Sequence, residues 1–366
     1  MKTLLSLATL AVVLGLTLIS SASSPSFGGR ATAVQVLVPA TGTSITLADS
    51  GALPASGGGI GAALLTGSIP SGQTAGLVSL AAGTLHSAVV GLVGTDAEAS
   101  LANVSLTISG NGITVDFLMA RSTASCGAGP TVAGSAQLAS LVVNGQTITV
   151  TGAANQTVAL PNGTAIINEQ LPTVAGSTGK LTVNALRVTT RDALTGQPLA
   201  DVVLATADAE IQCLTGSALS TPPAWAQSTQ PDFASGGGWI PTQGGRATFG
   251  LVAGIQQDST LTGHLVYIDH GAVDFSLESA SITSFTASVC TATFKGNGTA
   301  SSGGMTGNVT FEVTLQDNGE PGRNDTFAIQ VSGAFTYSAN ATLAGGNLEV
   351  DGTFAGGKVL AHGNTC

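Results

Sequence analysis

The chemistry-bearing residues that lie closest together in this sequence form one acidic segment near its C-terminal end. Residues 317–325 read Asp-Asn-Gly-Glu-Pro-Gly-Arg-Asn-Asp. Hard oxygen ligands on a glycine-bent backbone suit Ca²⁺, and the candidate ligands are Asp317, Asn318, Glu320 and Asp325. The carboxylate spacing is not that of an EF-hand, and no helical pattern flanks the segment. The competing interpretation is a polar hairpin loop whose Asp and Asn side chains cap local amides.

Signatures of catalysis are absent from the sequence. It contains neither G-x-S-x-G nor H-E-x-x-H, the marks of a nucleophile elbow and of a zinc protease. The sequence of residues 352–358 is similar to that of a P-loop, but Val359 replaces the Ser or Thr that would bind Mg²⁺. His264 and His270 are six residues apart and would share one face of a strand. A metal site there would need a third ligand, so we interpret them as two strand-end histidines. No catalytic or cofactor-binding residue is predicted.

Two further sites stay open as alternatives. A hydrolase of unrecognised type would draw on the carboxylates of Asp269, Asp274 and Glu278, because paired carboxylates distant in sequence can still meet in a fold. A glycan-binding protein would use Trp239 or Tyr267 as stacking platforms, although core packing is the commoner role of such aromatics.

Composition narrows the class of protein. The 366 residues include only 10 Lys and Arg and 20 Asp and Glu, whereas Gly occurs 50 times. Hydrophobic residues make up 43% and aromatic residues 4%. The high hydrophobic fraction argues against a disordered chain, and the scarcity of charge argues against a coiled coil. A net charge of −10 excludes the basic face that nucleic-acid binding needs.

The N-terminus predicts export. Lys2 precedes an uncharged apolar run over residues 4–19, and Ser20, Ser21 and Ala22 supply the small residues of a cleavage site. This order is typical of a secretory signal peptide, predicted over residues 1–22. The run is shorter than the ~20 residues that a membrane span requires. We therefore expect a secreted or extracellular protein, associated with the cell surface, with no transmembrane anchor after cleavage.

Export to an oxidising compartment affects how the four cysteines are interpreted. Cys126, Cys213, Cys290 and Cys366 form no C-x-x-C motif, and an even number in an oxidising compartment favours disulfides. Four cysteines allow three connectivities. The economical pairing joins Cys126 to Cys213 and Cys290 to Cys366, with buried free thiols as the alternative.

Period-two alternation is the strongest structural signal. It occurs over residues 102–108, 113–119, 203–213, 309–315 and 327–331. In the run 203–213 the apolar odd positions, from Val203 to Cys213, predict the core face of a half-buried strand, and the polar even positions from Thr206 predict its solvent face. Asn111-Gly112 lies between the first two runs, and Asn and Gly tolerate the positive φ of a tight hairpin turn. Many short strands with regular turn signals predict an all-β protein of sandwich or barrel type.

A change in composition predicts two domains. Residues 216–234 hold Pro222, Pro223 and Pro231 among Ser, Thr, Ala and Gln, which suits a semi-rigid linker. The flanking segments, 23–215 and 235–366, are of ordinary domain size. Each opens on Gly-Gly-Arg-Ala-Thr, at 28–32 and 244–248. We expect two β-sandwich-like domains joined by this linker.

Several spread motifs carry a resemblance to a known family. In the first half they begin at Phe27, Asn111, Asn144, Asn168, Asn184 and Ala209, and in the second half at Gly236, Arg246, Tyr267 and Asp317. The first half resembles the bacterial choice-of-anchor P family, and the second resembles the domain that often follows such modules. The resemblance implies a secreted or surface-attached bacterial protein without an established activity. The chain ends at Cys366 without the sorting motif or apolar tail of an anchor.

Three functions compete on these grounds. The first is a non-enzymatic structural or adhesive protein of the cell envelope or extracellular space, whose edge strands or loops contact envelope components. The second is an extracellular glycan-binding protein, and the third is a hydrolase with an unrecognised carboxylate site. The scarcity of charged residues that could act as acid, base or metal ligand favours the first.

Overall fold

The computed structural model describes residues 25–214, 232–354 and 358–360. Over these ranges the regular elements are strands, apart from the short 3-10 turn η1 (Ser71–Thr74), and this confirms the all-β prediction. No helix in the described ranges is long and apolar enough to cross a bilayer. The predicted signal peptide and most of the predicted linker lie outside the described residues, and the strand β16 already begins at Asp232.

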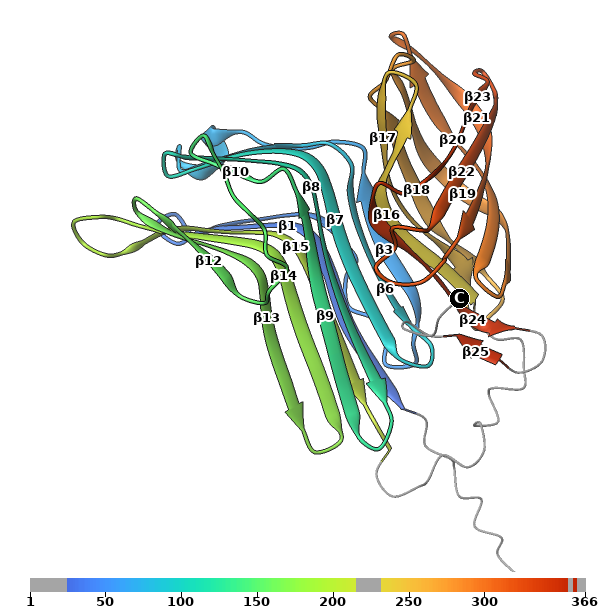
Figure 1. Cartoon of the computed structure of the whole chain (residues 1–366), viewed down its shortest axis with the longest axis horizontal. Helices are drawn as coiled ribbons and strands as arrows, with labels where there is room; N and C mark the ends of the chain where they lie inside the picture. The colour runs from blue at the N-terminus through green and yellow to red at the C-terminus, as the bar shows by residue number, and fades with distance from the viewer. Residues whose placement is uncertain (1–24, 215–231, 355–357, 361–366) are drawn as a thin grey trace, which may run out of the picture.

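Two antiparallel sheets from the first half of the chain face each other (Figure 1). Sheet A has six strands in the order β12 (Gln156–Leu160), β13 (Gly163–Ala175), β14 (Thr178–Arg191), β15 (Pro198–Gln212), β1 (Ser26–Val38) and β2 (Thr43–Asp49). Sheet B has nine strands, of which the main path runs β11 (Gln146–Thr147), β10 (Val142–Val143), β8 (Asn111–Cys126), β7 (Thr95–Ile108), β5 (Val78–Ala82) and β4 (Gly67–Ile69). The other strands of sheet B are β6 (Leu85–Gly91) on β7, β3 (Gly58–Leu64) on β6, and β9 (Pro130–Ala139) on β8. Their inward side chains, mainly Ala, Val, Leu and Ile, form one shared core.

The long strands of both sheets bend sharply at one level (Figure 1). In sheet A the pairing of every strand in the main block skips one residue at that level, and the skipped residues are Ala33, Ala48, Asn168, Ala185 and Ala205. The positive φ angles of Ala48, Asn168 and Ala205 are 46°, 52° and 55°. Left-handed backbone in a strand disrupts the ladder and turns the chain, as in a bulge. Sheet A lies on the inner side of this bend, so its outer face is concave.

The bend also exchanges the two faces of a strand. Ala207, Ala209 and Ile211 are buried as the alternation predicted, but Val203 points outward while Leu204 is buried. The prediction that Val203 lies on the core face was wrong. Ala205 has a positive φ and shifts the alternation by one residue, so Val203 and Ala207 lie on opposite faces.

The predicted hairpin of β7 and β8 is present, with a different turn. Ile108 pairs with Asn111, so the two turn residues are Ser109 and Gly110, with φ of 46° and 85°. Positive φ at both positions is what a tight two-residue hairpin requires. Asn111 instead begins β8, and its Nδ2 donates to the carbonyl of Ile108 at 3.1 Å.

The second half of the chain forms one continuous sheet. Sheet C has ten antiparallel strands in the order β23 (Tyr337–Thr342), β22 (Thr326–Gly333), β21 (Met305–Gln316), β20 (Thr291–Ser302), β19 (Phe275–Ser288), β18 (Leu261–Asp269), β17 (Gly245–Ile255), β16 (Asp232–Thr242), β24 (Gly345–Phe354) and β25 (Lys358–Leu360). It curls around its own core, so that its two arms face each other as the sheets of a sandwich do (Figure 1). Aromatic stacking fills this core: the ring centroids of Phe249 and Phe327 lie 4.2 Å apart, as do those of Phe275 and Tyr337.

Sheet C packs closely against sheet B. Phe233 and Val252 of sheet C form an apolar cluster with Ala88 and Val90 of β6. Glycines make the close approach possible: a Cβ on Gly59 would lie 2.3 Å from the Phe233 ring, a distance that van der Waals contact forbids. The lower part of sheet B is therefore covered on both faces, by sheet A and by sheet C.

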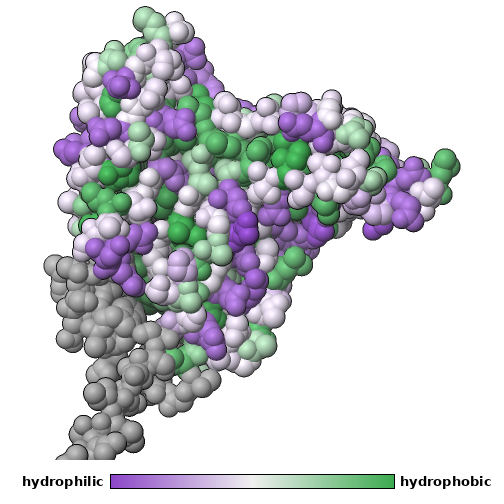
Figure 2. All heavy atoms as spheres, turned by 180° about the vertical axis from the view of Figure 1, so that it is seen from behind, coloured by the Kyte–Doolittle hydropathy of each residue, from purple (hydrophilic) through white to green (hydrophobic). Residues whose placement is uncertain are grey.

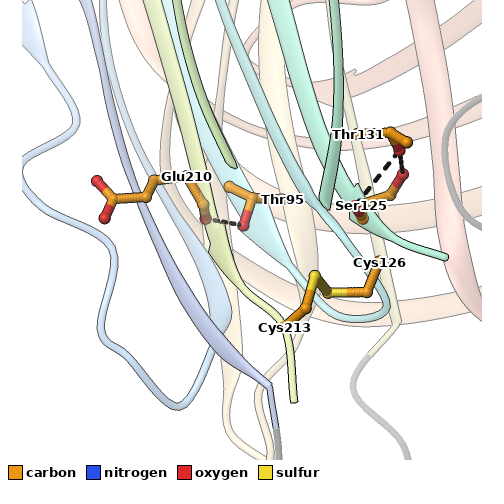
Figure 3. The surroundings of a disulfide bond; sticks show 6 residues. All are labelled: Thr95, Ser125, Cys126, Thr131, Glu210 and Cys213. Carbon is orange, nitrogen blue, oxygen red and sulfur yellow. Dashed lines mark hydrogen bonds between the residues drawn. A yellow bond between two sulfur atoms is a disulfide. The ribbon is translucent and has the colours of Figure 1, made fainter. Parts of the chain in front are cut away.

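A disulfide ties sheet A to sheet B at the lower end of the bent strands. Cys126, the last residue of β8, is bonded to Cys213, which follows β15 (Figure 3). Close by, the Thr95 hydroxyl of sheet B donates to the Glu210 carbonyl of sheet A at 2.8 Å (Figure 3). The Cys126–Cys213 bond confirms the first predicted disulfide pair. No described cysteine is a free thiol, and Cys366, the predicted partner of Cys290, lies outside the described residues.

Candidate functional site

The acidic segment predicted to bind calcium forms the loop between β21 and β22. The Asp317 carboxylate accepts a hydrogen bond from the Gly319 amide at 2.9 Å. Asp325 accepts from the amides of Asn318 and Leu348, each at 2.9 Å. These carboxylate oxygens therefore accept hydrogen bonds from backbone amides, as the alternative interpretation of a capped polar loop requires.

Of the two other candidates, Asn318 donates from Nδ2 to the Asn324 carbonyl at 2.7 Å, and Glu320 forms an ion pair at 2.5 Å with Arg121 of sheet B. Within the described residues, no three His, Cys, Asp or Glu side chains gather closely enough to hold a metal ion. Burial raises the pKa of Asp317 to about 6 and that of Asp325 to about 7. Calcium binding by this loop stays a prediction.

The carboxylates considered for a hydrolase do not converge. Asp269 is buried in the core of sheet C, where it accepts hydrogen bonds from Tyr337 at 2.9 Å and Thr242 at 2.7 Å. It pairs across the strands with Phe275, and so shares the inner face with it. Glu278 lies three positions after Phe275 in the same strand, so it points to the outer face, where it is exposed. Asp274 is also exposed. The three carboxylates therefore line no common site.

Of the two aromatics considered as glycan platforms, Tyr267 is buried and Trp239 is half-buried. Tyr267 is fully buried, and its hydroxyl lies 2.6 Å from that of Tyr337. Trp239 packs against the apolar cluster formed by Phe117 and Met119 of sheet B, and the Arg246 guanidinium lies 5.7 Å from its ring centroid. The Tyr267 ring is therefore closed to a sugar, and the Trp239 ring lies between sheet B and Arg246.

The concave outer face of sheet A carries a continuous row of polar side chains at the level of the bend. Cross-strand pairing aligns the members of this polar row, which are Glu169, Asn184, Thr206, Thr32 and Asp49. Asn184 donates to Glu169 at 2.7 Å and accepts from the Thr206 hydroxyl at 2.9 Å. The positive φ at Asn168 and Ala205 turns both neighbouring strands here, so the row lies in the angle of the bend.

Arg187 links Glu169 of the polar row to Asp201, which lies further along the same face of the sheet. Its Nε and Nη2 donate to the two oxygens of Asp201 at 3.1 and 2.7 Å, and its Nη1 lies 3.3 Å from Glu169. The hydrogen bonds to Asp201 are the main cause that raises the pKa of Arg187. A bidentate guanidinium held in this way is fixed in orientation and keeps its planar face available.

Further ion pairs flank the polar row on the same face. The Lys180 ammonium lies 2.9 Å from Asp208 and 3.5 Å from Glu210, and Arg30 pairs with Asp49. Hydrogen bonding from Arg30 holds the pKa of Asp49 below its ordinary value. A chain with only 10 basic residues therefore places Arg30, Lys180 and Arg187 together on one concave surface.

Arg187, Asp201, Asn184 and Thr206 of this face line a groove of about 400 Å³, which we call the sheet A groove. Its lining includes Gln35, Thr46, Thr182, Asn184, Arg187 and Asp201. None of the described residues that line it is aromatic. Figure 2 shows hydrophilic residues gathered in the angle beneath the projecting arm of the molecule. Among the described lining residues Arg187 is the one cation, and Asp201 pairs with it, so the groove offers neighbouring donors and acceptors rather than a field of one sign. Such a surface suits a neutral, polyhydroxylated ligand.

Sequence reasoning did not single out the groove residues as a site. The alternation over residues 206–212 correctly placed Thr206, Asp208 and Glu210 on the wet face. Their partners on β13, β14 and β1 come from pairings far apart in the chain. The one local signal was the density of Arg, Asp and Glu between residues 169 and 210, in a chain of which charged residues form 8%.

Comparison with known proteins assigns no family. No known family matches the sequence, and no curated protein is similar to it. A solved structure described as an AttH protein from Nitrosomonas europaea aligns with 89% of this chain and 92% of its own, at 9% identity and a TM-score of 0.16. A likeness this weak carries no argument about fold or function.

Proposed function

We propose that this chain is an exported, non-enzymatic binding protein of adhesive or structural type, which holds an extracellular or envelope glycan in the sheet A groove. The observation that carries the proposal is that Arg187, Asp201 and Asn184, which line the groove, are fixed by hydrogen bonds among themselves and with the buried Glu169. Planar guanidinium, carboxylate and amide groups fixed at neighbouring positions can pair with adjacent hydroxyls of a sugar, which both donate and accept.

Export is supported by two independent features. The N-terminal sequence has the order of a secretory signal peptide. The Cys126–Cys213 disulfide joins two sheets, and such bonds persist in oxidising compartments. The resemblance to choice-of-anchor P proteins agrees with a bacterial surface location.

A binding rather than a catalytic role is supported by how the groups are engaged. Catalysis by carboxylates needs an acid and a base whose environments set their pKa values apart. In the groove, Asp201 is neutralised by Arg187 and Glu169 is bonded to Asn184. These side chains are arranged to make hydrogen bonds of fixed geometry, which gives orientation and specificity.

Binding of the mature protein to a panel of immobilised neutral polysaccharides and peptidoglycan fragments tests the proposal. We expect Arg187→Met to reduce affinity for the bound glycan at least tenfold, because it removes the charged, bidentate donor of the groove and frees Asp201 to rotate. The control is Lys295→Met, which breaks a comparable cross-strand pair with Glu312 on the outer face of sheet C. Retention of wild-type affinity by Arg187→Met would contradict the proposal.

A further inference from the structure

Two histidines from distant parts of the chain meet where sheet B contacts sheet C. The Nδ1 atom of His86 in β6 lies 3.1 Å from the Nε2 atom of His264 in β18, and the ring centroids are 5.3 Å apart. His86 is completely buried. An N–H···N bond needs one nitrogen to act as acceptor, so at least one ring must be neutral while the contact exists.

The second nitrogen of His86 fixes the direction of this bond. His86 Nε2 lies 3.1 Å from the buried carboxylate of Glu98 on β7. Because a carboxylate only accepts, Nε2 carries the proton and donates, which leaves Nδ1 as the acceptor for the N–H of His264. A chain of hydrogen bonds thus runs from sheet C through His264 and His86 to Glu98 of sheet B.

Glycines on the facing strands leave the space that the imidazoles occupy. A Cβ on Gly250 of β17 would lie 2.3 Å from the Cβ of His86, and one on Gly61 of β3 would lie 2.8 Å from the His264 ring. Each histidine therefore sits against a glycine of the opposite sheet. With so little free space around its ring, His86 cannot move away from His264 to relieve repulsion unless the sheets themselves move apart.

Few charges face the pair. Glu98 contacts His86, and His86 is the titratable group that acts on His264. Burial lowers the pKa of His86 to about 3. Burial, and then the neighbouring His86, place the pKa of His264 well below its ordinary value. Both rings are therefore neutral at pH 7.

Other titratable groups lie elsewhere along the same contact. His270 lies 3.0 Å from the Asn103 amide, and its pKa is also lowered by burial. Beyond Glu98, Arg121 of β8 interacts with Glu320 of the β21–β22 loop and with Glu349 and Asp351 of β24. Those carboxylates in turn neighbour Asp317, Asp325 and Asp96. Burial raises the pKa values of Asp317 and Asp325. Their protonation as the pH falls therefore favours the closed contact, whereas protonation of the histidines opposes it.

We propose that the His86–His264 contact is an acid-sensitive latch, which holds sheet C against sheet B at neutral pH and releases it when both imidazoles are protonated. A depressed pKa means that the stabilisation is complete above the ordinary value of about 6.5 and is lost as the pH falls below it. With a pKa of about 3 when closed and about 6.5 when open, His86 alone raises the opening equilibrium constant about 100-fold between pH 7.5 and 4.5. His264 acts in the same direction.

Small-angle scattering of the whole mature protein between pH 7.5 and 4.5 tests the latch, with Trp239 emission as a second reporter because this ring packs on sheet B. We expect the wild type to expand reversibly on acidification. The double variant His86→Gln with His264→Gln keeps polar groups that do not titrate, and should lose at least tenfold of the pH response. His270→Gln replaces an exposed histidine outside the His86–His264 pair, so it is the control and should retain most of the response.

The histidine ring protons give a test that needs no variant. The sequence has four histidines, and NMR titration should show two of them unprotonated down to the pH at which the protein expands. Titration of all four near pH 6.5 without any change in scattering would overturn the proposal. An equal acid response in the double variant and the wild type would overturn it as well.

Discussion

Replacing Arg121 by Met removes the cation around which the contact between sheets B and C is built. The guanidinium is 8% exposed and pairs with Glu349, which is also 8% exposed, and with Glu320 at 39%. Burial opposes the charge of Arg121, but the surrounding carboxylates, Glu349 first, outweigh it and raise its pKa. Met has a similar length and fills much of the same volume, so the substitution tests charge rather than packing.

The expected cost follows from which carboxylate is left unpaired. Glu320 is exposed enough to turn toward water, whereas Glu349 has no such route. Removing one partner of a buried ion pair typically costs about 3–5 kcal/mol, because an uncompensated charge stays in the interior. Adding Glu349→Gln removes that charge and leaves a buried amide, so we expect it to restore about 2 kcal/mol.

Urea unfolding at pH 7, followed by Trp fluorescence and far-UV circular dichroism, measures both values. Lys295→Met is the control, since its exposed pair with Glu312 is worth less than about 1 kcal/mol. A loss below 1 kcal/mol for Arg121→Met would refute the reasoning. So would a double variant no more stable than the single one, because the unpaired Glu349 charge would then not be the source of the cost.

Two further predictions concern other parts of the fold. Replacing Cys126 and Cys213 by Ala should lower the free energy of unfolding by about 4.5 kcal/mol, since the bond closes a loop with a sequence separation of 87 residues; a loss under 1 kcal/mol in urea titrations would show that the reduced chain gains little freedom. The pKa of Asp325 is raised to about 7 by burial, so the stability that it contributes is complete below about pH 4 and is lost as the pH rises through 7. Asp325→Asn should therefore flatten the fall in stability between pH 5 and 8, and an unchanged pH profile would count against this assignment.

The strand content was predictable from alternation because a half-buried strand needs period two wherever one face meets a core. Val309, Phe311 and Val313 are all buried as that pattern requires. The bend was not predictable: Ala205 adopts a positive φ that its side chain does not favour. Its conformation is imposed by the neighbouring strands, and it reverses the face of Val203.

The candidate sites illustrate the same limit. Asp317 and Asp325 stood close together in sequence, and the structure commits both to backbone amides. The polar groove and the histidine latch join residues separated by long stretches of chain, such as His86 and His264, which are 178 residues apart. Strand pairing at that distance depends on register and topology, which local patterns do not specify.

Titration of the mature protein with a polysaccharide that it retains, by calorimetry at neutral pH, tests the proposed function most directly. The groove predicts saturable binding that Arg187→Met weakens at least tenfold and that Lys295→Met leaves unchanged. Binding that is equal for the wild type and both variants would place the ligand elsewhere and contradict the role of the sheet A groove.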